Sequence, residues 1–108
     1  MHKVDLLQGT LDMLVLKTLS RESMNGYAIA RWIQITTDDA LQLEEGTLYP
    51  ALYRMERKGW ITSKWGLSEN NRRARYYSLT SAGRKQLQTE AKAWNNVSMA
   101  IEKIMQTA

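Results

Sequence analysis

The segment TLYPALYRMERKGWITSKW, residues 47–65, contains the pattern that decides the fold. Within it, Leu48, Leu52 and Met55 are spaced by four and three residues, so a helix would carry all three on one side. We therefore predict a helix over residues 47–58 that buries this side in the core.

Turn and capping residues mark the ends of this helix and the start of the next elements. Thr47 is a good N-cap, and Pro50 falls within the first turn, where a missing N–H does no harm. Gly59 fits a left-handed helix end. Residues 60–65 and 74–79 are rich in aromatic and β-branched residues, which predicts two strands.

The turn between these strands, residues 66–73, is polar enough for the tip of a hairpin. Three arginines, Arg72, Arg73 and Arg75, fall within four positions at the end of this turn and the start of the next strand, on a ribbon that is expected to protrude. Arginine and asparagine on such a wing suit a DNA backbone or minor groove, although arginine-rich turns also serve solubility. The expected wing contacts are Lys64, Asn71, Arg72, Arg73 and Arg75.

The outward side of the helix over residues 47–58 is a candidate reader of DNA bases. In helix-turn-helix proteins the N-terminal part of this helix reads base edges in the major groove, and arginine pairs bidentately with guanine. Alternatively, its two tyrosines are half-buried packing residues. The residues expected on this side are Thr47, Tyr49, Pro50, Tyr53, Arg54 and Arg57.

A first helix is expected upstream, capped by Thr10. Met13 and Leu16 fall off its main apolar stripe, so this helix is apolar on two sides. In so small a domain we expect the second side to contact another subunit, together with Leu6.

A second helix is expected over residues 27–33, ending near residues 36–37. The alternation of leucine with polar residues over positions 41–44 predicts a very short strand. The order is then helix, helix, short strand, helix, hairpin, helix. This is a mainly α winged helix-turn-helix with a small β-hairpin.

Thr80 is expected to cap a final helix that runs towards Ala108. Its apolar residues recur at alternating steps of four and three, and this heptad-like seam predicts a dimerisation helix. Alternatively, the helix folds back on its own domain. The interface residues expected on it are Leu87, Ala91, Trp94, Ile101 and Met105.

Composition limits the classes of function. The chain has 108 residues, enough for one domain, no cysteine, and a single histidine, His2. These residues supply neither the usual zinc ligands nor a base for a serine nucleophile. We expect no enzyme, no metal and no cofactor. With no apolar run long enough to span a membrane and no secretory signal, we expect a cytoplasmic protein.

Charge is distributed unevenly along the chain. Residues 54–85 hold nine Lys/Arg and two Glu, a net +7, so the rest is −3 within a total of +4. A basic middle in a mildly acidic protein is typical of a nucleic-acid binder, although a solvated basic surface has the same composition.

Six segments in this order and spacing resemble the PadR family of bacterial transcriptional regulators, over about residues 5–94. The segments are residues 24–29 (MNGYAI), 45–52 (EGTLYPAL), 59–61 (GWI), 65–66 (WG), 71–77 (NRRARYY) and 79–83 (LTSAG).

The resemblance implies a homodimeric winged-helix repressor of the short branch, with one C-terminal helix pairing with the partner. Family members release operator DNA when a small molecule, often phenolic or aromatic, binds. By position, Tyr27, Thr47, Tyr49 and Pro50 fall where the family touches DNA. Trp94, followed by Val97, resembles a tryptophan that lines a dimer-interface pocket in some multidrug-sensing members.

We therefore expect a homodimeric repressor on an inverted-repeat DNA operator. Residues 1–80 would form the DNA-binding domain and residues 81–108 the dimerisation helix, with a small aromatic molecule as candidate effector and no membrane partner. The alternative is a winged-helix module that binds another protein, for which an apolar wing would be more typical than an arginine-rich one.

Overall fold

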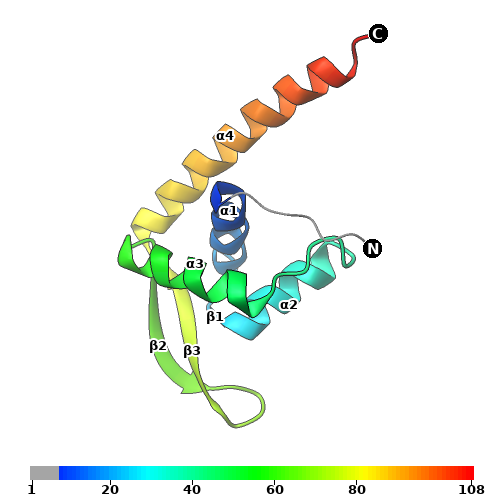
Figure 1. The fold of residues 1–108 in the computed structure, drawn as a ribbon. Helices are drawn as coiled ribbons and strands as arrows, with labels where there is room; N and C mark the ends of the chain where they lie inside the picture. Colours follow the sequence, from blue (N-terminus) through cyan, green and yellow to red (C-terminus); the bar gives the residue numbers. More distant parts are fainter. Residues whose placement is uncertain (1–7) are drawn as a thin grey trace.

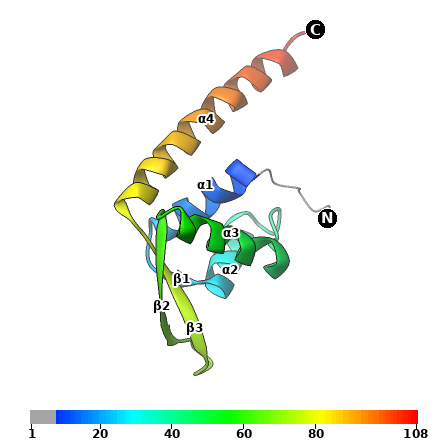
Figure 2. The same cartoon turned by 60° about the vertical axis from the view of Figure 1, so that its left-hand side comes forward.

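The computed structural model describes residues 8–108 and confirms the mainly α winged-helix architecture (Figure 1). Three helices and a three-stranded sheet form the body, and a long fourth helix leaves it at an angle (Figures 1 and 2). The elements are α1 (Gln8–Leu19), β1 (Met24–Asn25), α2 (Gly26–Thr36), α3 (Glu45–Arg57), β2 (Ile61–Leu67), β3 (Arg73–Leu79) and α4 (Ser81–Met105).

The sheet is antiparallel with strand order β1-β3-β2. The strand predicted at residues 41–44 is wrong, since these residues are irregular and the short strand is β1. β1 pairs with the free edge of β3, Met24 opposite Tyr77, and the Ser23 hydroxyl donates to the Tyr77 carbonyl at 2.9 Å. A two-residue strand of this kind depends on its partner and carries little pattern of its own.

The core lies between α1, α2, α3 and the root of the hairpin. The predicted inward residues Leu48, Leu52 and Met55 are all buried. Leu16, expected at a subunit interface, is fully buried in the core of its own chain, and Met13 is half-buried. The two-sided apolar character of α1 follows from its position, because it packs against α4 as well as against α2 and α3.

Helix ends agree only in part with the capping residues predicted. Thr80 caps α4 as expected, its hydroxyl accepting the Gly83 N–H at 3.0 Å, and Gly59 has the predicted left-handed φ of 79°. Thr10 and Thr47 are not caps, since α1 already includes Gln8 and α3 begins at Glu45. Pro50 consequently lies inside α3, beyond its first turn.

Helix α4 starts against the root of the wing and then extends away from it (Figure 2). A side chain at Gly83 would collide with the Trp60 carbonyl, so only glycine allows this close approach. Leu87 is half-buried against the core, which places the first turns of α4 on their own domain. No helix within residues 8–108 is long and apolar enough to cross a membrane.

Candidate nucleic-acid interface

The two faces of the β2–β3 ribbon carry different side chains. Residues opposite each other in a register share a face, so Trp65 lies with Arg75, and Leu67 with Arg73. This face is turned towards α3, because Ser63 on the same face donates to the Glu56 carboxylate of α3 at 2.7 Å.

Lys64 lies opposite Tyr76 and therefore on the other face of the ribbon. Lys64 was predicted as a wing contact like Arg73 and Arg75, but it does not share their face of the ribbon. The pleat reverses the side of every successive residue, so a lysine next to Trp65 in sequence points away from it.

A concavity of about 1170 Å³ lies between the start of α2, the outward side of α3 and the wing. Its walls combine aromatic rings with guanidinium groups, and the most exposed rings are those of Tyr27 (73% exposed), Tyr53 (61%) and Trp65 (56%). Among residues 8–108, four arginines and three glutamates line the concavity, and its guanidinium and hydroxyl donors suit a phosphate backbone. Its lining includes Tyr27, Arg31, Tyr49, Tyr53, Glu56, Trp65, Arg72, Arg73 and Arg75.

The outward side of α3 contains most of the residues predicted there. Thr47, Pro50 and Arg57 are exposed, and the Arg57 guanidinium carbon lies 5.8 Å from the centre of the Tyr53 ring. Tyr49 is less accessible than Tyr53, because its ring lies over Gly26 at the start of α2.

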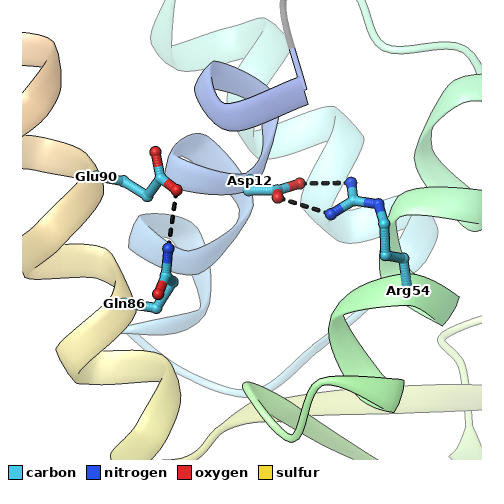
Figure 3. Close-up of polar contacts among 4 residues, drawn as sticks. All are labelled: Asp12, Arg54, Gln86 and Glu90. Carbon is cyan, nitrogen blue, oxygen red and sulfur yellow. Dashed lines mark hydrogen bonds and ion pairs between the residues drawn. The ribbon is translucent and has the colours of Figure 1, made fainter.

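Arg54 departs from the prediction. Its guanidinium donates two hydrogen bonds of 2.7 Å to the two carboxylate oxygens of Asp12 in α1 (Figure 3). The Asp12 side chain is only 4% exposed and that of Arg54 27%. The hydrogen bonds raise the pKa of Arg54 above its ordinary value. Arg54 therefore joins α3 to α1 and does not present a free guanidinium to DNA.

The wing arginines have another kind of neighbour. The guanidinium carbons of Arg73 and Arg75 lie 4.5 and 5.4 Å from the centre of the Trp65 ring. Arg75 also lies 3.8 Å from the Glu56 carboxylate, which ties the ribbon to α3. Burial raises the pKa of Tyr77 at the base of this face, with the charge of Arg75 opposing the shift.

The tip of the wing is a tight turn closed by backbone hydrogen bonds. The Asn71 N–H donates to the Ser68 carbonyl at 2.9 Å, and the Ser68 N–H donates to the Arg72 carbonyl at 2.8 Å. Asn71 has φ of 60°, a left-handed conformation that asparagine tolerates better than most residues. Asn71 thus shapes the tip, and Arg72 beside it is exposed.

Sequence reasoning missed three residues of this surface: Arg31, Glu56 and Trp65. Arg31 lies one helical turn after Tyr27, so the spacing of α2 could have revealed it. Trp65 was placed in a strand and in the segment 65–66 of the resemblance but was given no role at this surface, and its pairing with Arg75 depends on a register that no local pattern states.

The residues expected at a subunit interface fall into two groups. Leu87 and Leu16 contact their own domain, while Leu6 lies outside the described residues. Further along α4, apolar side chains are exposed within residues 8–108. On one side of the helix these are Ala91, Trp94 (50% exposed), Val97, Ile101 (53%), Ile104 and Met105 (76%), and Met99 is exposed on the opposite side.

Two helices packed on the core, an outward-facing third helix and a basic ribbon beside it define a winged-helix DNA-binding protein. Residues 15–89 match the model of the "Transcriptional regulator PadR-like family". The chain belongs to this family and is a DNA-binding transcriptional regulator, not an enzyme. Within residues 8–108 no cluster of three or more His, Cys, Asp or Glu side chains could hold a metal.

Similar proteins span nearly the whole chain. A transcriptional regulator from Clostridium thermocellum is 33% identical, with a TM-score of 0.83, covering 93% of this chain and 97% of its own. A PadR family transcription regulator from hypervirulent Clostridium difficile R20291 is 31% identical, with a TM-score of 0.74, covering 88% and 97%. An uncharacterized protein from Lysinibacillus sphaericus is 30% identical over 98% of this chain and 97% of its own.

Proposed function

We propose that this regulator is a cytoplasmic homodimer that represses transcription from an inverted-repeat operator. The uncovered apolar side of α4 is the observation that carries the proposal. Each head, residues 1–80, would occupy one half-site, and residues 81–108 would join the two subunits.

The apolar residues of α4 form one stripe along the helix, which begins against the body of the domain and continues on the part of α4 that is exposed to solvent. At its start, Gly83 and Leu87 on this stripe pack on the chain's own domain. Trp94, Ile101 and Met105 follow at helical steps, and no element of the part of the chain that the structure describes covers them. Exposed apolar stripes of this length are typical of subunit interfaces, and a second copy of the helix offers the same surface in return.

A two-fold dimer would present two copies of α3 and two wings to one side of a duplex. Half-sites then recur about 34 Å apart, one helical turn of DNA. In each half-site Tyr53 and Arg57 would face base edges, with Tyr27, Thr47, Tyr49 and Pro50 near the backbone. The wing residues Asn71, Arg72, Arg73 and Arg75 would follow the adjacent phosphates.

A small aromatic molecule is the effector that the interface would accept. Trp94 and Val97 lie one turn apart on the uncovered side of α4 and would line a pocket between the two copies. Such a molecule shifts the protein away from DNA only if it binds the non-binding arrangement of the two heads more tightly. Quenching of Trp94 fluorescence, followed in a variant that retains this tryptophan alone, measures that binding.

Fluorescence anisotropy with two duplexes tests the proposal as a whole. One duplex is the intergenic DNA upstream of the gene itself, and the other has the same composition in scrambled order. We expect tight binding to the first and weak, steeply salt-dependent binding to the second. Equal and weak binding to both would contradict an autoregulatory operator.

The variant Ile101→Glu tests whether α4 joins the subunits. A carboxylate at the centre of the stripe should produce monomers that lose operator binding together with dimerisation, as measured by light scattering and anisotropy. Met99→Glu is the matched control, because Met99 is equally exposed but lies two residues away, on the opposite side of the helix. A dimer that survives Ile101→Glu would contradict this interface.

A further inference from the structure

Trp65 occupies an unusual position for a large aromatic residue on the wing. It is more than half exposed on the face of the ribbon that lines the concavity, and it is not one of the buried core residues. Instead, the guanidinium groups of Arg73 and Arg75 lie over its ring, at 4.5 and 5.4 Å from the centre.

The geometry of stacking leaves a guanidinium able to bind an anion. The N–H groups of arginine lie in the plane of the group and point outwards from its edge. An aromatic ring attracts the flat face of the cation and leaves this edge open. An arginine that packs on a ring in this way is therefore held in place while its donors remain available to a phosphate. Arg75 meets this condition only in part, because its Nη1 also lies 3.8 Å from the Glu56 carboxylate.

The register of the sheet makes this arrangement a fixed feature of the ribbon. Trp65 and Arg75 are directly opposed, and Arg73 is the diagonal neighbour on the same face, within reach of a ring as large as indole. The bond from Ser63 to Glu56 and the ion pair from Arg75 to Glu56 then hold this face of the ribbon against α3.

We propose that Trp65 is a positioning residue for DNA binding, which holds Arg73 and Arg75 in the conformation that contacts phosphates. The inference rests on the DNA-binding role of the wing. Ordering two long side chains before binding removes part of the conformational entropy that binding would otherwise have to overcome. Trp65 acts through the two arginines, and their guanidinium groups make the contacts.

Two substitutions of Trp65 separate the effect of its aromatic π face from the effect of its apolar bulk. Trp65→Leu keeps an apolar side chain without a π face, and Trp65→Phe keeps a π face of smaller area. We expect Trp65→Leu to weaken binding to the upstream intergenic duplex and to the scrambled duplex alike, by roughly ten-fold. Its salt slope should stay near that of the wild type, because the same phosphates are still neutralised. Trp65→Phe should recover most of the affinity.

The free protein provides a readout that does not depend on DNA. In NMR spectra, the Nε–H signals of Arg73 and Arg75 should show ring-current shifts that Trp65→Leu removes and Trp65→Phe largely retains. Thermal unfolding of each variant checks that the wing remains folded. If the wild type shows the ring-current shifts but binds neither duplex, the stacking holds and the proposed operator function fails.

Three results would overturn the inference. In the first, Trp65→Leu binds DNA within two-fold of the wild type. In the second, Trp65→Phe and Trp65→Leu lose the same affinity, which would show that the ring is not the active feature. In the third, the salt slope of Trp65→Leu falls by the amount expected for the loss of two phosphate contacts. This would indicate that Trp65 is needed for the wing to fold.

Discussion

Two regions of the same basic surface use arginine in opposite ways. In α3, Arg54 places both arms of its guanidinium on the nearly buried carboxylate of Asp12. In the wing, the guanidinium carbon of Arg73 lies 4.5 Å from the centre of the Trp65 ring, at a site open to solvent. The two residues belong to the same basic segment of the sequence, and composition does not distinguish them.

The difference shows that the neighbour of an arginine decides what it can do. A carboxylate satisfies the edge of the guanidinium, so Arg54 is committed to joining α3 to α1. An aromatic ring occupies only the face, so Arg73 keeps its donors. Figure 3 also shows that Gln86 and Glu90 of α4 lie on the other side of α1 from Arg54, so α1 lies between α3 and α4.

The largest effect is expected on the free energy of unfolding, when Arg54 is replaced. Arg54→Met removes the partner of a buried carboxylate, and we expect the free energy of unfolding to fall by about 3 kcal/mol. Urea denaturation at one fixed protein concentration measures this loss. The salt slope of DNA binding should not change, because Arg54 makes no phosphate contact.

Arg57→Met is the matched control for this experiment, since it removes an exposed arginine from the same helix. Its free energy of unfolding should stay within about 0.5 kcal/mol of the wild type. Equal losses of unfolding free energy in the two variants would contradict a structural role for the Asp12–Arg54 pair. A lower salt slope in Arg54→Met would show that Arg54 does contact DNA phosphates.

The second prediction concerns the wing. Arg73→Ala should weaken binding to specific and scrambled DNA by a similar factor, roughly ten-fold, and reduce the salt slope by about 0.9. The free energy of unfolding should change by less than about 0.5 kcal/mol. Anisotropy across a series of salt concentrations gives both quantities for DNA. An unchanged slope would count against phosphate contact by this arginine.

Sequence patterns predicted those elements whose signal is local. The buried side of α3, the Gly59 helix end, the Thr80 cap and both strands of the wing each depend on residues within a few positions of one another. Their periodicity and capping chemistry act over that range, so one sequence is sufficient to read them.

The errors arose where a residue's environment is set by distant parts of the chain. Arg54 seemed free because Asp12 lies 42 residues earlier. β1 exists because β3 offers it an edge, and Leu16 is covered by the remainder of the core. The face of the wing on which Lys64 lies could not be predicted either, because the register between two strands is a property of the folded pair.

The third prediction tests the conformation of the wing tip. Asn71→Val should lower the free energy of unfolding by about 1 kcal/mol, because a β-branched residue is strained at φ of 60°. Asn71→Gly relieves the same strain and should stay within a few tenths of the wild type. Thermal or urea unfolding distinguishes the two, and equal losses would indicate that the asparagine side chain, not its backbone, holds the tip.

The smallest effect on DNA affinity is expected for Lys64→Ala, and this variant distinguishes the two faces of the wing. Lys64→Ala and Arg73→Ala each remove one positive charge from the same ribbon, but from opposite faces. A general attraction between the ribbon and DNA would make the two losses similar. If DNA binds through the face that lines the concavity, Lys64→Ala should lower the affinity for DNA by less than two-fold and leave the salt slope unchanged. Exposed charges away from the contact are largely screened at physiological salt. A ten-fold loss at Lys64 would show that DNA approaches the other face of the wing, and the stacked arginines would then have no phosphate to contact.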